Sequence, residues 1–525
     1  MAARSLGWLL LPLTATGVAL WQRLLWVSAI SDDGLTFANA SAWAAGRTPY
    51  RDFLLATPPG AVGLYAALFK ATGVAYPPAR LLTAMSVLLT VAALWDTARR
   101  CVPSAAAAVA ATLYGTWTAT FLFYEPHHFW SVTLPVVMAW ALMRARESRR
   151  RVTWAAGAGL AAGLGVVVVQ TAAAPLLAGL VAAVVFLDVA ATGAFVAAAA
   201  AVGPLTLVWM LAAGLPGDFW RETIVYPATT FRALNPVQVP LLPVQLADLG
   251  PPVYRALPLE KLVVWLAGFL TSLGVCVAAL VVLARFRRSG SALGILILGA
   301  AGLDLSVLLA RPTGPFLWMA AAVNLVLLAA AIIWLQTPRW LAAGLAAAAL
   351  VLSATPLVQA VSDGCGLGSS GFRQEVSAAG GSVCVEAGEA GSLRPAVAFG
   401  RLHAREGVVY LAIITPAYTL AGSTPPVGYA WVAPDDLTTI DLERLEAQLG
   451  SRSVAWIISA PRIESAGFHS NSTQRAPDGR WTLDVYVDQH FDAVGRCGDW
   501  TLYHARGLPA ASAQPCVAGT ATASR

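Results

Sequence analysis

Long apolar runs separated by short polar segments occupy the first 360 residues of the chain. Runs of roughly 17–25 apolar residues are long enough to cross a bilayer as helices. We predict about eleven crossings: 6–28, 80–98, 103–121, 129–145, 153–170, 172–190, 194–213, 259–284, 291–310, 315–335 and 339–360. Residues 153–190 fit two short helices and one broken helix equally well. The pattern is typical of a polytopic α-helical membrane protein.

Arginines gather in the polar segments between these runs. They form clusters at 99–100, 144–151 and 285–288. With the N-terminus inside, all three clusters fall on the cytoplasmic side, as the positive-inside rule requires. This orientation places four segments on the outer face: the 31–78 loop, the 124–128 turn, the 214–258 loop and the chain after residue 360. The 214–258 loop is irregular and polar enough to cover a cavity mouth.

Composition agrees with a membrane protein. The chain is 58% hydrophobic and only 12% charged, whereas soluble domains carry about 25% charged residues. The net charge is +6, and many of the positive charges lie in the arginine clusters. Orientation in the bilayer and contacts with lipid headgroups explain these clusters better than nucleic-acid binding does.

A different pattern follows residue 360, and we expect a small outer α/β domain over 361–525, beside a membrane domain over 1–360. Residues 408–414 and 454–458 predict buried strands. Alternation over 481–487 predicts a half-buried strand. Thr438 and the leucines that follow it predict a helix. An even number of cysteines in this region suggests disulfides: Cys365, Cys384, Cys497 and Cys516.

Two adjacent carboxylates, Asp32 and Asp33, lie just beyond the first crossing. Charges at a membrane edge are costly to desolvate, which favours a functional role. They could also simply begin the short helix that we expect up to Gly46, because acidic residues stabilise helix starts. A second short helix, Gly60 to Thr72, follows two prolines. We expect both helices to lie along the membrane surface.

The same loop carries three short motifs in sequence. They are Ser31-Asp32-Asp33-Gly34, then Gly46-Arg47-Thr48-Pro49-Tyr50-Arg51-Asp52-Phe53, then Thr57-Pro58-Pro59-Gly60. Together they resemble the first outer loop of GT-C-fold glycosyltransferases, in the branch of the protein mannosyltransferases and aminoarabinose transferases. The resemblance implies a GT-C-like membrane domain with a small extracytoplasmic C-terminal domain.

The resemblance also implies a reaction. A sugar would move, with inversion, from a polyprenyl-phosphate donor to an acceptor at the outer face of the cell (inner) membrane. The acceptor could be a lipid-linked glycan, a cell-wall polymer or a protein. Asp32 would act as general base on the acceptor hydroxyl, and Asp33 would support it. Glu125 would orient the acceptor or share a cation with Asp32.

The leaving phosphate requires a positive partner. Arg311, at the outer end of a predicted crossing, is the first candidate for a phosphate ligand, followed by Arg51 and Arg47. Some relatives carry lysine where this chain has Thr57, and many carry lysine at the outer end of the fifth helix, where this chain has Val169-Gln170-Thr171. The sequence leaves open whether a divalent cation takes part.

Two other classes of function are compatible with many crossings. A transporter or lipid flippase would also need embedded charges, although the chain shows no clear internal repeat of the kind common in transporters. A noncatalytic envelope scaffold would use the C-terminal region to bind a partner.

Overall fold

The computed structural model describes residues 2–27, 33–100, 102–120, 122, 125–231, 292–309, 373–411, 416–430, 439–451, 453–459, 481–509 and 516, with the single residues 344, 347 and 354. The predicted crossing 259–284 lies outside the described residues, and so do 315–335 and, apart from those three single residues, 339–360. Asp32 and Arg311 also lie outside them.

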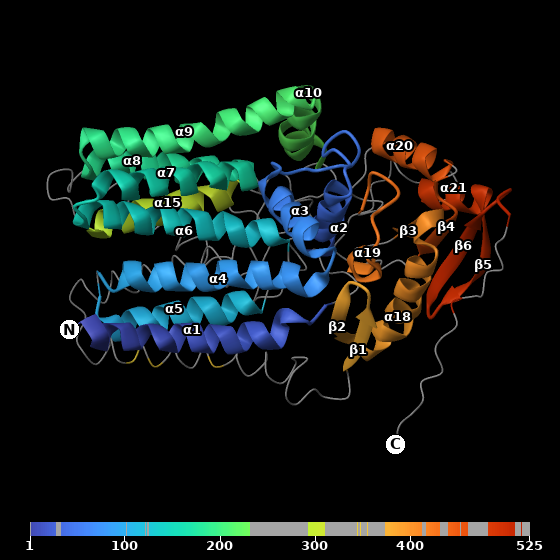
Figure 1. Cartoon of the computed structure of the whole chain (residues 1–525), viewed down its shortest axis with the longest axis horizontal. Helices are drawn as coiled ribbons and strands as arrows, with labels where there is room; N and C mark the ends of the chain where they lie inside the picture. Colours follow the sequence, from blue (N-terminus) through green and yellow to red (C-terminus); the bar gives the residue numbers. More distant parts are fainter. Residues whose placement is uncertain are drawn as a thin grey trace, which may run out of the picture.

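A bundle of roughly parallel and antiparallel helices forms one half of the molecule (Figure 1). Its long helices are α1 (Ala2–Leu24), α4 (Tyr76–Ala98), α5 (Ser104–Ala119), α6 (Pro126–Glu147), α7 (Arg151–Val168), α8 (Ala173–Phe186), α9 (Val189–Ala212) and α15 (Ala292–Leu309). Each corresponds to a predicted crossing. Among the described residues, α4, α7 and α9 are long and apolar enough to cross a membrane. The polytopic helical architecture is confirmed, while the number of crossings stays a prediction.

The region over 153–190 forms two helices. A short 3-10 turn, η1 (Gln170–Ala172), separates α7 from α8. Arg151, at the start of α7, lies 3.4 Å from the carboxylate of Asp188, just beyond α8. The chain therefore returns along α8 to the end of the bundle where α7 begins, and the broken-helix alternative is wrong.

Arginines from two predicted clusters meet at this end of the bundle. Near the end of α4, the carboxylate of Asp96 accepts hydrogen bonds from Arg99 and Arg100, each at 2.7 Å. Arg144 of α6 lies 3.7 Å from the same carboxylate. This common end agrees with the predicted cytoplasmic face, because the first outer loop and the C-terminal region lie at the other end (Figure 1).

Small residues allow α7 and α9 to approach closely. A side chain at Gly163 would place its Cβ 2.7 Å from the carbonyl oxygen of Ala199, which is too close for any real contact. Gly159, one turn earlier, lies against Phe195 in the same way. Small residues four apart are typical of packed membrane helices.

The two short helices of the first outer loop form as predicted, but the setting of the first helix differs from the prediction. They are α2 (Asp33–Ala44) and α3 (Gly60–Thr72). Gly46 follows α2 with a φ of 96°, a left-handed conformation that glycine adopts without strain. Nine residues of α2 are buried. The helix is therefore enclosed by neighbouring elements and does not lie on a membrane surface with one face exposed.

The C-terminal region is an α/β domain, as predicted (Figure 1). Its elements are β1 (Arg373–Ala378), β2 (Gly381–Glu386), α18 (Ala387–Leu402), β3 (Val408–Leu411), α19 (Pro416–Ala421), α20 (Thr439–Leu449), β4 (Trp456–Ser459), α21 (Thr482–His490), β5 (Phe491–Cys497) and β6 (Trp500–Ala505). The strands β1 and β2 form a hairpin. The other four form a sheet in the order β3-β4-β6-β5, with β3 and β4 parallel.

One predicted strand in this domain is wrong. Residues 482–487 form the first part of helix α21, and Trp481 is its N-cap. They are helical although the apolar residues from Trp481 to Val487 alternate with polar ones. Leu483 and Val487 are buried and lie one helical turn apart, whereas Val485 is only partly buried. Leu483 and Val487 fit the two-residue period of a strand and also the period of a helix. The packing of α21 as a helix buries both side chains, so the helix forms.

Disulfides are present in the domain. Cys497, at the end of β5, is bonded to Cys516. Cys384 in β2 is also disulfide-bonded, and Cys365 lies outside the described residues.

The first outer loop and the C-terminal region share one hydrophobic core. Side chains from both sides pack in it, including Phe37, Tyr50, Phe53, Val385, Tyr418 and Trp456. Backbone hydrogen bonds also join the two: the amide of Val27 donates to Cys384 at 2.9 Å, and that of Leu54 to Gly428 at 2.9 Å. The division into domains at residue 360 stays a prediction, and the loop depends on the C-terminal region for its burial.

Candidate functional site

The second residue of the acidic pair, Asp33, is buried, and both oxygens of its carboxylate accept hydrogen bonds. Asp33 begins α2 and is 1% exposed. One oxygen of its carboxylate accepts a hydrogen bond from the hydroxyl of Tyr76 at 2.6 Å, and the other accepts one from Nε of Arg80 at 2.6 Å. Burial raises the pKa of Asp33, and the Arg80 guanidinium opposes that rise. Asp32 precedes this cluster, outside the described residues.

Arg80 connects three elements around Asp33. Its guanidinium also donates to the carbonyl oxygen of Arg23 at 3.1 Å and to that of Trp26, both at the end of α1. Arg80 thereby fixes the start of α2 against α1 and α4. The sequence analysis missed this residue, although an arginine at the edge of a predicted crossing was a usable signal. The cluster therefore positions Asp33 and the start of α2.

The motif around Pro49 is a tight turn. Tyr50 has a φ of 68°, which is uncommon for a residue with a side chain. Its amide donates to the carbonyl oxygen of Phe53 at 2.9 Å. The amide of Thr48 donates to the carboxylate of Asp52 at 2.7 Å. The Asp52 carboxylate therefore closes the turn by accepting from the backbone four residues earlier.

The two arginines of this motif have different environments. Arg47 donates to the backbone carbonyl oxygens of Pro425 and Val427 and to that of Asp52. Its guanidinium therefore joins the first outer loop to the C-terminal domain. The side chain of Arg51 is 58% exposed and lies 3.3 Å from the Asp52 carboxylate. Of the two, only Arg51 is available to a ligand in solvent.

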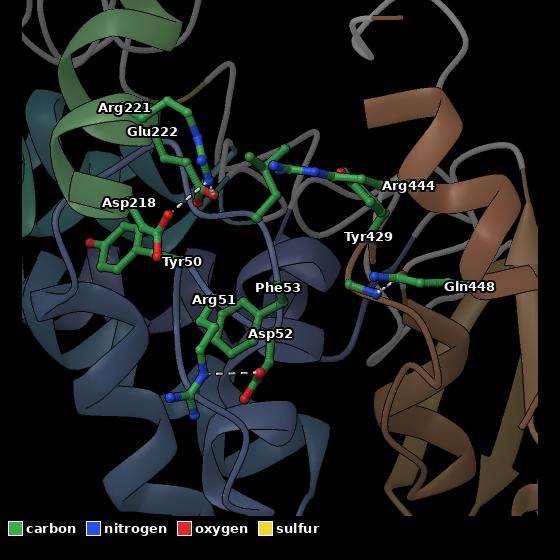
Figure 2. Close-up of a pocket in the computed structure, with 12 residues that line it drawn as sticks. Tyr50, Arg51, Asp52, Phe53, Asp218, Arg221, Glu222, Tyr429, Arg444 and Gln448 are labelled. Atoms are coloured by element: carbon green, nitrogen blue, oxygen red, sulfur yellow. Dashed lines mark hydrogen bonds and ion pairs between the residues drawn. The ribbon is translucent and has the colours of Figure 1, made fainter. Parts of the chain in front are cut away.

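A pocket of about 320 Å³ lies where three segments meet (Figure 2). Residues 50–54 of the first outer loop form one wall. The second comes from α10 (Pro216–Trp220) and the π-helix η2 (Arg221–Val225), and the third from the C-terminal domain. The predicted role of the 214–258 loop as cover of a cavity mouth fits its described part. The charged lining residues are Arg51, Asp52, Asp218, Arg221, Glu222 and Arg444.

Glu222 is the buried acid of this pocket. It is 5% exposed, and its carboxylate accepts a hydrogen bond from the amide of Leu55 at 3.0 Å. Arg221 lies 3.3 Å from Glu222 and 3.2 Å from Asp218. Burial raises the pKa of Glu222 to about 7, against the hydrogen bond from Leu55 and the charge of Arg221. The sequence placed Glu222 in a polar loop but gave no sign of its burial.

Glu125 lies at the start of α6 beside a histidine. Its carboxylate is 2.7 Å from Nδ1 of His127, and the rings of His127 and His128 are 4.0 Å apart. The described residues contain no group of three His, Cys, Asp or Glu side chains that could hold a metal ion. A divalent cation at Asp33 would face the Arg80 guanidinium on the same carboxylate, so Asp33 does not fit a metal site. A cation shared by Glu125 and Asp32 stays a prediction, because Asp32 lies outside the described residues.

Another predicted position, the run Val169-Gln170-Thr171, follows α7 at the end of the bundle opposite the arginines. Gln170, where relatives often carry lysine, donates from Nε2 to the carbonyl oxygen of Thr223 at 3.1 Å. In α15, Gly294 packs against Phe186 and Gly302 against Pro175. Helix α15 therefore runs from the arginine-rich end of the bundle to the outer end. Arg311 follows it, outside the described residues.

Comparisons with known proteins agree with this architecture. Residues 56–212 match the family model described as dolichyl-phosphate-mannose-protein mannosyltransferase. No curated protein sequence matches the chain. The structure of ArnT from Cupriavidus metallidurans bound to undecaprenyl phosphate is 14% identical, with a TM-score of 0.56, and the similarity covers 95% of this chain and 98% of ArnT.

Two further structures are similar over most of the chain. ArnT in the apo state is 16% identical with a TM-score of 0.51, covering 96% of this chain and 98% of ArnT. The archaeal oligosaccharyltransferase AglB from Archaeoglobus fulgidus, in complex with an inhibitory peptide and a dolichol-phosphate, is 12% identical with a TM-score of 0.51. That similarity covers 96% of this chain and 75% of AglB. Together with the family-model match, these similarities confirm that the chain has the GT-C fold of the membrane glycosyltransferases that its first outer loop resembles.

Proposed function

We propose that the protein is a membrane glycosyltransferase that moves a sugar from a polyprenyl-phosphate donor to a hydroxyl-bearing acceptor at the outer face of the cell (inner) membrane. One observation carries the proposal. The fold matches ArnT bound to undecaprenyl phosphate over 95% of this chain and 98% of ArnT. The Asp33–Arg80 cluster supports it, because it fixes the acidic loop at one end of the bundle.

The acceptor hydroxyl is a weak nucleophile at neutral pH and requires a base. Asp32 takes its proton while the hydroxyl oxygen attacks the anomeric carbon from the face opposite the phosphate. The bond between the anomeric carbon and the phosphate oxygen breaks, and polyprenyl phosphate leaves with the bonding electrons. The sugar is transferred with inversion. Asp33 contributes by positioning, since both of its oxygens are held by Tyr76 and Arg80.

Charge accumulates on the departing phosphate, so a cation stabilises the transition state. Arg311 and Arg51 are the proposed ligands. Arg311 follows the outer end of α15, and Arg51 is exposed at the pocket. Arg47 is assigned a structural role, because three backbone carbonyl oxygens already occupy its guanidinium. Glu125 orients the acceptor.

The substitution Asp32→Asn tests the base. It should lower transfer about 10²–10⁴-fold, the usual contribution of a general base, without changing membrane insertion. The readout is mass spectrometry of lipid-linked sugars and surface glycans in a deletion strain that carries the variant. Asp492→Asn is the matched control, because it makes the same change at an exposed site. Retained transfer in Asp32→Asn would exclude Asp32 as the base.

The purified protein and the deletion strain also distinguish the transferase from the other two classes of function. A transporter or flippase would move its substrate across proteoliposomes without forming a glycosylated product. A noncatalytic scaffold would leave the glycans of the deletion strain unchanged in structure. Either result would overturn the proposed transferase.

A further inference from the structure

We propose that the pocket between the first outer loop, α10–η2 and the C-terminal domain is a saccharide-binding subsite for the acceptor, in which Arg444 and Gln448 of α20 select the acceptor. This inference rests on the proposed function. It assigns the choice of acceptor to side chains from the C-terminal domain, outside the motifs of the first outer loop.

Arg444 and Gln448 lie one turn apart on α20 and both line the pocket. Figure 2 shows Arg444 reaching from α20 into the pocket, towards the side where Arg221 and Glu222 lie. Oε1 of Gln448 accepts a hydrogen bond from the amide of Gly428 at 2.7 Å. This bond fixes the orientation of the Gln448 side chain and turns its amide NH2 group into a defined donor. Within the described part of the chain, Arg444 makes no ion pair.

The charges of the pocket favour a neutral, hydroxyl-rich ligand. Three carboxyl groups and three guanidinium groups line it. Arg51 is paired with Asp52, and Arg221 with Asp218 and Glu222. On the side of α10 and η2, a phosphate would have to compete with Asp218 and Glu222 for Arg221. Neighbouring hydroxyls of a sugar can instead donate to the carboxylates and accept from the guanidinium groups at the same time.

Size and position fit the same class of ligand. The volume of about 320 Å³ is at the lower end for small-molecule sites, which span roughly 300–1,000 Å³. The pocket wall is connected to the acidic loop, because Nδ2 of Asn39 in α2 donates to the carbonyl oxygen of Leu54 at 3.4 Å. Glu222 holds the next residue, Leu55, through its amide. A saccharide bound here lies against the loop that follows the acid pair.

The experiment measures saccharide binding directly on the full-length protein in lipid nanodiscs. The probes are methyl hexopyranosides and methyl pentofuranosides, and the readout is saturation-transfer-difference NMR. Arg444→Ala removes the guanidinium. Gln448→Glu keeps an oxygen that accepts from Gly428, replaces the NH2 donor with an acceptor oxygen and adds a negative charge. Arg401→Ala and Gln489→Glu make the same changes on other helices of the C-terminal domain, α18 and α21, and serve as matched controls.

We expect at least one glycoside to bind the unaltered protein. Binding should weaken by roughly tenfold or more in Arg444→Ala and Gln448→Glu, as expected when a hydrogen bond involving a charged group is lost. The two control variants should bind normally. Unchanged binding in both pocket variants, or no binding to the unaltered protein, would overturn the subsite. Binding that depends on the pocket in a protein without transfer activity would uphold the subsite and overturn the proposed function.

Discussion

Two polar clusters of this protein differ in how completely their charges are satisfied. Around Asp33, every partner is internal, and both Asp33 and Arg80 are buried. Around Glu222, the acid is buried, but its partner Arg221 is exposed and lines a pocket together with the exposed Arg51. A closed network resists exchange of partners, whereas an open one accepts a ligand in place of solvent.

The comparison separates positioning from binding. Buried ion pairs are expensive to form and costly to break, and they specify one arrangement of the elements that they join. Exposed pairs contribute little to stability and rearrange easily. The following predictions test this contrast, beginning with the largest expected effect.

Arg80→Met should lower the free energy of unfolding by about 3–5 kcal/mol, because Asp33 would remain as an unpaired buried charge. The measurement is thermal unfolding of the purified protein in detergent. The double variant with Asp33→Leu should recover most of the loss, since no buried charge is left. An Arg80→Met protein that unfolds like the unaltered one would show that the cluster is not a closed network.

Arg47→Ala should lower the free energy of unfolding by about 2–3 kcal/mol, because three carbonyl oxygens lose a charged donor. The C-terminal domain should also become easier to cleave from the bundle, which limited proteolysis would detect. Equal protease resistance with and without Arg47 would contradict its role in joining the two regions.

The variant Glu222→Gln should become more stable than the unaltered protein as pH rises. The pKa of Glu222 is raised from 4.5 to about 7, so the folded protein binds a proton more tightly than the unfolded chain. Its contribution to stability is full below about pH 4.5 and is lost as pH rises through about 7. Glutamine keeps an acceptor for the amide of Leu55.

Relative to the unaltered protein, Glu222→Gln should therefore gain about 2–3 kcal/mol between pH 5 and pH 8. Thermal unfolding across that range measures the difference. Asp492→Asn, at an exposed site, should show no such trend. A difference between Glu222→Gln and the unaltered protein that is constant with pH would contradict the buried setting of Glu222.

Arg51→Ala should change the free energy of unfolding by less than about 0.5 kcal/mol, because the side chain is exposed. Transfer should fall nonetheless if Arg51 binds the donor phosphate. Arg47→Ala is the comparison, because it is expected to lower the free energy of unfolding, whereas Arg51→Ala is expected to leave it nearly unchanged. A large loss of stability in Arg51→Ala would contradict the distinction between a structural Arg47 and an exposed, ligand-binding Arg51.

The sequence predicted the parts of the fold that depend on local pattern. Apolar length located the crossings, and the glycine and proline signals bounded α2 and α3. The pattern over 481–487 misled, because Leu483 and Val487 satisfy both strand and helix periods. The burial of α2 could not be predicted either, since it depends on contacts with residues more than 300 positions later.

The site was predicted unevenly for a similar reason. The motifs located the loop, but their arginines look equivalent in sequence and differ in the structure. Arg47 is set apart from Arg51 only by the carbonyl oxygens of Pro425 and Val427. Glu222 and Arg444 come from segments without motifs, and only the three-dimensional fold brings them to one pocket.

The core shared by the first outer loop and the C-terminal domain has a consequence for biosynthesis. The loop leaves the ribosome early, but its buried partners Tyr418 and Trp456 are synthesised about 400 residues later. At roughly 5–20 residues per second, this delay is about 20–80 s. During that time Phe37 and Phe53 lack their final packing. A nascent chain therefore needs the membrane or a chaperone to shield this loop, and a chain truncated before β4 cannot complete it.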